Sequence, residues 1–170
     1  MFDKLLELIG EFWETVKFFQ IIMPYEKGVR IRKGVLHAVL GPGLHGKLPI
    51  LDEFMVDTVV QTTEFLANQT FTTKDNHAIY IRGIVVKKVS NIVKWLVESE
   101  DQEGIVKDVC YAAIAEVALN NTWDYIRTEA FQQEITIKAR KRARKYGLKI
   151  IELRPAELVK LRAYRFVTGF

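Results

Sequence analysis

The sequence has one cysteine, four prolines and three histidines among its 170 residues. A single cysteine excludes an internal disulfide framework and a four-cysteine zinc site. Ten glycines and four prolines exclude collagen-like and linker-like chains. Because 49% of the residues are hydrophobic and 27% are charged, the chain has enough apolar material to fold, which excludes disorder of the whole chain. The length suits one domain, or two small ones packed together.

Long hydrophobic runs are also missing. No stretch approaches the ~18 consecutive apolar residues of a transmembrane helix. Glu7, Glu11 and Glu14 interrupt the N-terminal region and argue against a secretory signal peptide, whose middle is uncharged. We therefore expect a chain that is not secreted and does not cross a bilayer, although it can lie on one.

The net charge of +4 comes from one short segment. Residues 138–149 hold seven basic residues and no acidic one, whereas the rest of the chain holds 18 basic and 21 acidic residues. Six of the seven are candidate contacts with a neighbouring subunit or an anionic partner: Lys138, Arg140, Lys141, Arg142, Arg144 and Lys145.

Three partners suit this segment: the acidic residues between 98 and 103 of a neighbouring subunit, an anionic headgroup, or nucleic acid. A solvated helix face is the simplest interpretation, since cations are favourable near a helix C-terminus. The segment lacks interleaved aromatic residues for base stacking, which disfavours nucleic acid.

Residues 2–17 are predicted to form an amphipathic helix, because their apolar residues follow the i, i+3, i+4, i+7 spacing. Pro24 ends any helix, so we assign residues 1–24 to an N-terminal membrane-associating segment. Its candidate membrane-contact residues are Phe2, Leu5, Leu6, Ile9, Phe12, Trp13, Val16 and Phe19. Aromatic residues suit a membrane interface, whereas the acidic polar face would be repelled by anionic lipid. The alternative is a helix docked on its own domain or on a neighbouring subunit.

The segment from Tyr25 to about Val89 alternates apolar and polar residues as strands do. The connections are too short for helical crossovers, so we expect mostly antiparallel pairing. Residues 70–73 and 77–89 are predicted to form a hairpin around the turn at 74–76.

Helical periodicity takes over after this hairpin. Helices are predicted over residues 105–117, near Trp123, and over 129–146, where Gly147 provides a left-handed cap. A short strand at 149–153 follows. A last helix is expected from Pro155, because proline suits the first helical position. The pattern as a whole predicts an α+β fold, with a curved sheet covered by helices.

Candidate catalytic groups are few. Cys110 lies on an apolar helical face and is expected to be a buried, inert thiol. The three histidines, His37, His45 and His77, have no metal-type spacing. No phosphate-binding motif occurs, and Pro42 removes an N–H donor from the glycine-containing turn around it. We therefore expect neither an enzyme, nor a metal site, nor a cofactor.

Three blocks of the sequence, in order, resemble the SPFH domain (stomatin, prohibitin, flotillin; also called band 7). The first contains the Gly28-Val29 strand, the Gly41-Pro42-Gly43-Leu44-His45 segment and Pro49-Ile50; the second is the Thr73-Lys74-Asp75-Asn76 hairpin; the third is the helix–Gly147–strand region. The resemblance covers about residues 21–160. It implies structural roles for Gly28, Gly34, Gly41, Pro42, Gly43, Leu44, His45, Pro49, Asp75, Asn76 and Gly147.

The resemblance implies an SPFH-like fold over residues 25–154, namely a curved, mostly antiparallel sheet packed with helices and preceded by the amphipathic helix. Family members usually continue into a long coiled coil, whereas residues 155–170 are expected to form only a short helix. The implied function is a non-enzymatic, self-oligomerising scaffold, peripheral on the cytoplasmic face of a membrane, that organises a membrane patch or partner proteins.

Two alternatives from other classes stay open. One is a soluble shell- or ring-forming homo-oligomer whose N-terminal helix packs on a neighbouring subunit. The other is a basic module that binds nucleic acid through residues 138–149.

Overall fold

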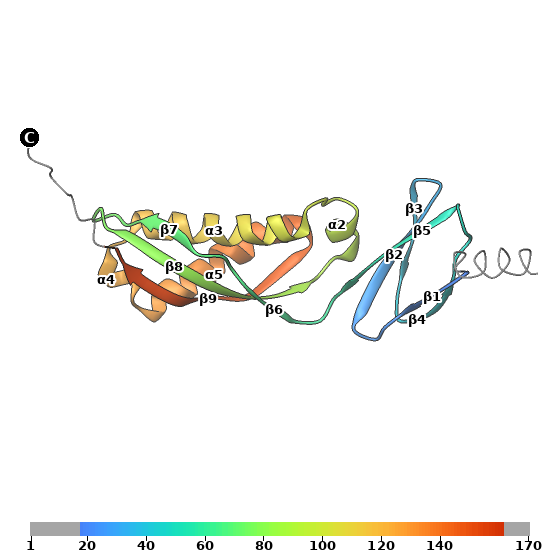
Figure 1. Ribbon diagram of the computed structural model, residues 1–170, viewed down its shortest axis with the longest axis horizontal. Helices are drawn as coiled ribbons and strands as arrows, with labels where there is room; N and C mark the ends of the chain where they lie inside the picture. The colour runs from blue at the N-terminus through green and yellow to red at the C-terminus, as the bar shows by residue number, and fades with distance from the viewer. Residues whose placement is uncertain (1–17, 162–170) are drawn as a thin grey trace, which may run out of the picture. The chain divides into compact units, whose positions relative to one another are not determined.

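The computed structural model describes residues 18–161 (Figure 1). The predicted amphipathic helix, with its seven membrane-contact residues before position 17, lies outside the described residues. The chain divides into two compact units, one containing residues 18–60 and 91–100 and the other containing residues 61–90 and 101–161. Every strand pairing among the described residues is antiparallel. Together with the helices of the second unit, this confirms the α+β fold class.

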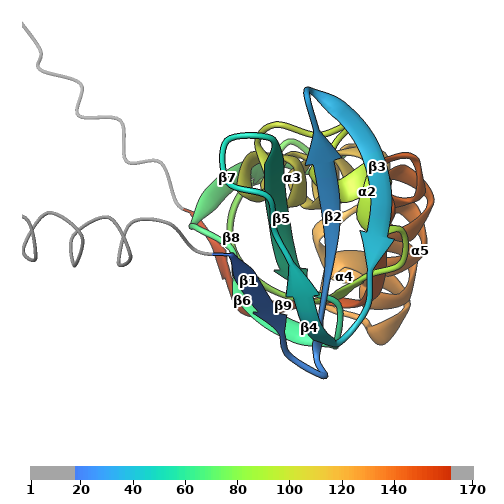
Figure 2. The same ribbon diagram turned by 90° about the vertical axis from the view of Figure 1, so that its right-hand side faces the viewer.

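The first unit contains two small sheets and one short helix (Figure 2). Its elements are β1 (Phe19–Ile22), β2 (Glu26–Arg32), β3 (Val35–Leu40), β4 (Gly43–Gly46), β5 (Asp52–Thr58) and α2 (Ile92–Leu96). β2 lies between β3 and β5, and β1 pairs with β4. The core of the unit includes Ile22, Val29 and Leu40, each at most 5% exposed.

Helix α2 was not predicted from the sequence. Asn91 caps it by accepting hydrogen bonds from the N–H groups of Val93 and Lys94. The helix packs on β2 and β5, and the indole Nε1 of Trp95 donates to Asp57 Oδ2 at 2.6 Å. Five residues are too few for helical periodicity to stand out in the sequence, so contacts with the sheet determine this helix.

The predicted boundary at residue 24 differs from the structure. Residues 19–22 form β1 rather than part of a separate segment, and Ile21 and Ile22 lie opposite Leu44 and Gly43 of β4. β-branched and aromatic residues favour a strand here, and Ile22 is 1% exposed because its side chain belongs to the core. The folded unit therefore begins before Tyr25.

The second unit packs three helices against a sheet centred on one long strand. Its elements are β6 (Thr62–Phe65), β7 (Gln69–Thr72), β8 (Ala78–Val89), α3 (Gln102–Asn120), α4 (Trp123–Ile126), α5 (Glu129–Ala143), the 3₁₀ helix η1 (Arg144–Tyr146) and β9 (Leu148–Lys160). β6 and β7 pair with one edge of β8, and β9 pairs with the other. The predicted hairpin and the long helix ending at Gly147 are confirmed, and Gly147 has the expected positive φ of 71°.

The helix expected from Pro155 is wrong over residues 155–160, which continue strand β9. Pro155 lies opposite Gly83, where the register between β8 and β9 shifts. A proline has no N–H to donate, and such an irregularity in a strand that pairs on one edge tolerates this loss. Pairing with β8 therefore outweighs the local preference of proline for the first turn of a helix.

Candidate membrane-contact and assembly surfaces

The β1–β4 ribbon exposes one apolar face. Side chains alternate along a strand, so Phe19 and Ile21 lie on one face and Ile22 on the other. Leu44 is directly opposite Ile21 in the register and shares its face. Phe19, Ile21 and Leu44 are 60–65% exposed. Three large apolar side chains thus remain uncovered by the unit that carries them.

The loop between β4 and β5 exposes more aliphatic surface. Leu48 and Leu51 are 49% and 42% exposed, and Ile50 is fully exposed at 104%. Ile50 also has a φ of 71°, in the left-handed region that β-branched residues rarely adopt. The Lys47 N–H donates to the Phe18 carbonyl at 2.7 Å, which places this loop beside the start of the ribbon. We call these residues the apolar tip; they are Phe19, Ile21, Leu44, Leu48, Ile50 and Leu51.

A buried carboxylate holds the loop in this shape. Asp52 is 5% exposed, and its two oxygens accept from Arg32 Nε at 2.6 Å and Arg32 Nη2 at 3.0 Å. Asp52 Oδ2 also accepts from the Leu48 N–H at 3.0 Å. These hydrogen bonds, the one from Arg32 foremost, hold the pKa of Asp52 well below its usual range. The Lys33 N–H donates to the Leu51 carbonyl, so the loop is tied to the β2–β3 turn as well.

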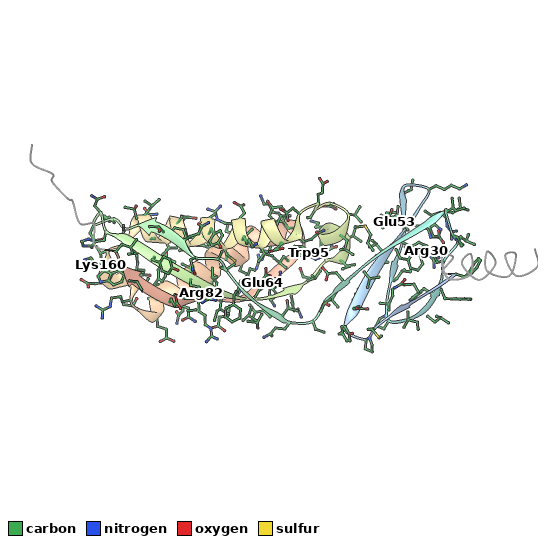
Figure 3. All side chains as sticks on the ribbon, viewed as in Figure 1. Arg30, Glu53, Glu64, Arg82, Trp95 and Lys160 are labelled. Atoms are coloured by element: carbon green, nitrogen blue, oxygen red, sulfur yellow. The ribbon has the colours of Figure 1, made fainter. Side chains whose placement is uncertain are left out.

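Three basic residues lie near the apolar tip. Arg30 (Figure 3) donates from Nη2 to the Gly46 carbonyl at 2.8 Å, and its guanidinium lies 4.9 Å from the centre of the Phe54 ring. Lys47 approaches the same ring from 5.8 Å, and Lys33 is exposed in the β2–β3 turn. Cations beside an exposed apolar surface are typical of proteins that bind a membrane interface.

Several residues of the family motifs have structural roles in this unit. A Cβ at Gly28 would lie 2.8 Å from the Met55 carbonyl oxygen, so only glycine allows β2 and β5 to approach this closely. The ring Nε2 of His45 donates to the Gly41 carbonyl at 2.7 Å and closes the Gly41-to-His45 segment. Gly34 lies in the β2–β3 turn, Pro42 between β3 and β4, and Pro49 in the loop of the apolar tip.

The second motif anchors a hairpin to a helix. Asp75 accepts from the Thr73 hydroxyl at 2.5 Å and from the Trp123 N–H, the first of α4, at 3.2 Å. The Thr73 hydrogen bond is the main reason why the pKa of Asp75 is lowered. Asn76 adopts a φ of 59°, as turn residues of this type can. The motif therefore fixes the β7–β8 turn against the start of α4.

The predicted basic contact residues divide between two sides of α5. Arg140 donates to the carbonyls of Ile150 and Ile151 at 2.9 and 2.8 Å, so it binds α5 to β9. Lys138, Lys141, Arg142 and Lys145 line a hollow beside Glu116 of α3. Lys138 and Arg142 both bind the carboxylate of Glu116 on α3, and Lys141, Arg144 and Lys145 are exposed. Lys138 and Arg142 lower the pKa of Glu116 to about 2.

The remaining candidate chemistry is sparse. Cys110 is 0% exposed, and burial raises the pKa of its thiol to about 12. Within residues 18–161, no three His, Cys, Asp or Glu side chains gather closely enough to hold a metal ion. In the same part of the chain, no helix combines the length and apolar character needed to cross a bilayer.

The fold and the sequence motifs together define the class of protein to which this chain belongs. A comparison with known families identifies that class. The family model of the SPFH domain / Band 7 family matches residues 20–160, so the chain belongs to this family. Members of the family are typically membrane-associated scaffolds that commonly oligomerise.

Three curated relatives are similar to this chain. An uncharacterised protein of Archaeoglobus fulgidus is 24% identical over 82% of this chain and 57% of its own length. Protein HflK of Haemophilus influenzae is 30% identical over 56% of this chain and 24% of its own length. An uncharacterised protein of Methanocaldococcus jannaschii is 33% identical over 52% and 44% of the two chains. The matched region thus spans about a quarter to somewhat over half of each relative.

Proposed function

We propose that this protein is a non-enzymatic scaffold that lies on the cytoplasmic face of a membrane, associates with copies of itself, and so organises a membrane patch or partner proteins. The observation that carries the proposal is the apolar tip. Its large aliphatic and aromatic side chains are exposed in a folded unit, and a loop containing Ile50 in an unfavourable conformation keeps part of them there.

The apolar tip supplies the physical basis for membrane binding. Full burial of one Leu, Ile or Phe side chain is worth roughly 1.5–3 kcal/mol, so partial insertion of several such side chains is sufficient for reversible attachment. Lys33 and Lys47 add attraction to anionic headgroups, worth about 1 kcal/mol per cation near the surface. The predicted N-terminal helix would join the same attachment, because Phe18 lies beside Lys47. Confinement to a plane then raises the effective concentration for lateral contacts.

Vesicle flotation tests this proposal. The full-length protein is expected to float with vesicles of neutral and anionic phospholipid, and a Leu48→Gln, Ile50→Asn variant is expected to float at least about tenfold more weakly. A separate Phe12→Glu, Trp13→Glu variant measures the contribution of the predicted N-terminal helix. Circular dichroism must show both variants folded.

If neither the full-length protein nor its variants float, the membrane part of the proposal is wrong. Sedimentation velocity without lipid then tests the alternative, since defined large particles would indicate a soluble shell or ring.

A further inference from the structure

A hollow of about 420 Å³ between α3 and α5 is lined by four cations and one carboxylate. We call the cations the basic groove; they are Lys138, Lys141, Arg142 and Lys145. Glu116 neutralises part of the charge, since its oxygens accept from Lys138 Nζ at 2.5 Å and Arg142 Nη2 at 2.7 Å. Lys141 and Lys145 form no ion pair with any residue between 18 and 161. The groove therefore keeps a positive charge available to an anionic partner.

The same chain carries a matching acidic segment, Glu98 to Glu103. Asp101 caps α3 by accepting from the Gly104 N–H, and Glu103 pairs with Lys107. Glu98 and Glu100 are exposed and have no ion pair within the described part of the chain. Between them Ser99 is buried, and its hydroxyl donates to the Lys94 carbonyl at 3.0 Å. This anchor fixes the backbone of the segment, which lowers the entropy that binding would cost.

The acidic segment leads into α3, and the same helix supplies the carboxylate of the groove. Asp101 is the N-cap of α3, and Glu116 follows fifteen residues later on the same helix. At 1.5 Å per residue, these positions are roughly 22 Å apart. Opposite charges on two surfaces of one chain suit a head-to-tail contact between two copies, because each copy offers one groove and one acidic segment.

We propose that the basic groove binds the acidic segment of a second copy of this chain, through Lys141 and Lys145 facing Glu98 and Glu100. The proposal rests on the self-association in the proposed function and assigns the surfaces that mediate it. Such a heterologous contact leaves one groove and one acidic segment free at the ends, so it extends into a row or closes into a ring. Glu116 keeps Lys138 and Arg142 positioned at the wall of the groove in the absence of a partner.

Charge reversal with exchange tests the contact. Donor- and acceptor-labelled full-length protein is bound to phosphatidylcholine–phosphatidylglycerol vesicles at matched surface density, and energy transfer reports self-association. Lys141→Glu with Lys145→Glu is expected to weaken association roughly tenfold or more, and Glu98→Lys with Glu100→Lys likewise. A protein that carries all four substitutions, or a mixture of the two double variants, is expected to recover association to within about twofold of wild type.

The control reverses the same number of charges elsewhere on the unit that carries the groove. Lys88 and Lys149 are exposed and lie opposite each other on β8 and β9. Lys88→Glu with Lys149→Glu is expected to leave association unchanged.

Three results would overturn the proposal. The first is unchanged association in both double variants. The second is failure of the fourfold variant to recover, with its circular dichroism intact. The third is loss of vesicle or oligonucleotide binding by the groove variant with normal association, which would assign the groove to lipid or nucleic acid instead.

Flotation of the wild-type protein is measured beside each assay. A wild type that floats and associates while the groove variants behave normally contradicts only the groove contact. A wild type that shows no energy transfer above that of randomly spread molecules contradicts self-association itself.

Discussion

Replacement of Ile50 by asparagine should change stability and membrane binding in opposite directions. The φ of Ile50 is 71°, and the left-handed conformation costs an L-residue roughly 1–2 kcal/mol, whereas asparagine adopts it more readily. The isoleucine side chain is fully exposed, so its removal forfeits no packing within the unit. We expect Ile50→Asn to raise the free energy of unfolding by about 0.5–1 kcal/mol.

The same change removes a side chain whose full burial is worth roughly 1.5–3 kcal/mol. Vesicle partitioning should therefore fall about tenfold to a hundredfold, since 1.4 kcal/mol corresponds to a factor of ten. A residue that lowers stability but favours binding is typical of functional sites. Urea denaturation and vesicle co-sedimentation measure the two quantities on one protein preparation.

A matched control is Ile137→Asn on α5, where the isoleucine is 62% exposed in a helix. This variant should bind vesicles normally and should not gain stability, because asparagine is a weaker helix former than most residues. If Ile50→Asn has a lower free energy of unfolding than the wild type, the loop is not strained at Ile50. If its partitioning into vesicles is unchanged, Ile50 does not contact the membrane.

Three further predictions concern charged and thiol groups. Asp52→Asn should lower the unfolding temperature and weaken vesicle binding together, because Arg32 loses its partner and the loop loses its anchor. Folding lowers the pKa of Asp52, so the ionised carboxylate stabilises the folded state above its unfolded pKa of about 3.9. This contribution to the free energy of unfolding is lost as the pH falls below that value. The acid denaturation of the Asp52→Asn variant should therefore be less steep than that of the wild type. Cys110, with its pKa raised to about 12, should resist thiol reagents at pH 8 until denaturant is added.

Local signals predicted most of the second unit, except that residues 155–160 continue strand β9 instead of forming the expected helix. The alternation of residues 77–89 is the pattern of a half-buried strand, and β8 covers Ala78–Val89. Gly147 marks the end of the long helix because a left-handed cap favours a residue without Cβ. The predicted hairpin turn also proved correct, although its attachment to α4 through Asp75 joins residues 48 positions apart and left no local pattern.

The apolar tip could be predicted only in part. Phe19 is among the predicted membrane contacts, whereas the aliphatic residues after Lys47 are not, and Pro49-Ile50 appears only as part of the first family block. They form a loop because Asp52, which pairs with Arg32 20 residues away, also accepts a hydrogen bond from the Leu48 N–H. An ion pair between residues so far apart in the sequence has no signature in periodicity. Four aliphatic or proline residues immediately before an aspartate were the signal available in the sequence.

Entry of the apolar tip into the membrane can be measured with an environment-sensitive fluorophore on an introduced cysteine. Ile50→Cys carries the probe, Ile137→Cys is the control, and Cys110 can stay because it is buried with a raised pKa. We expect a blue shift at position 50 on addition of vesicles, quenching there by brominated acyl chains, and neither effect at position 137. An unshifted and unquenched probe at position 50, on protein that floats with the vesicles, would contradict entry of the apolar tip into the membrane.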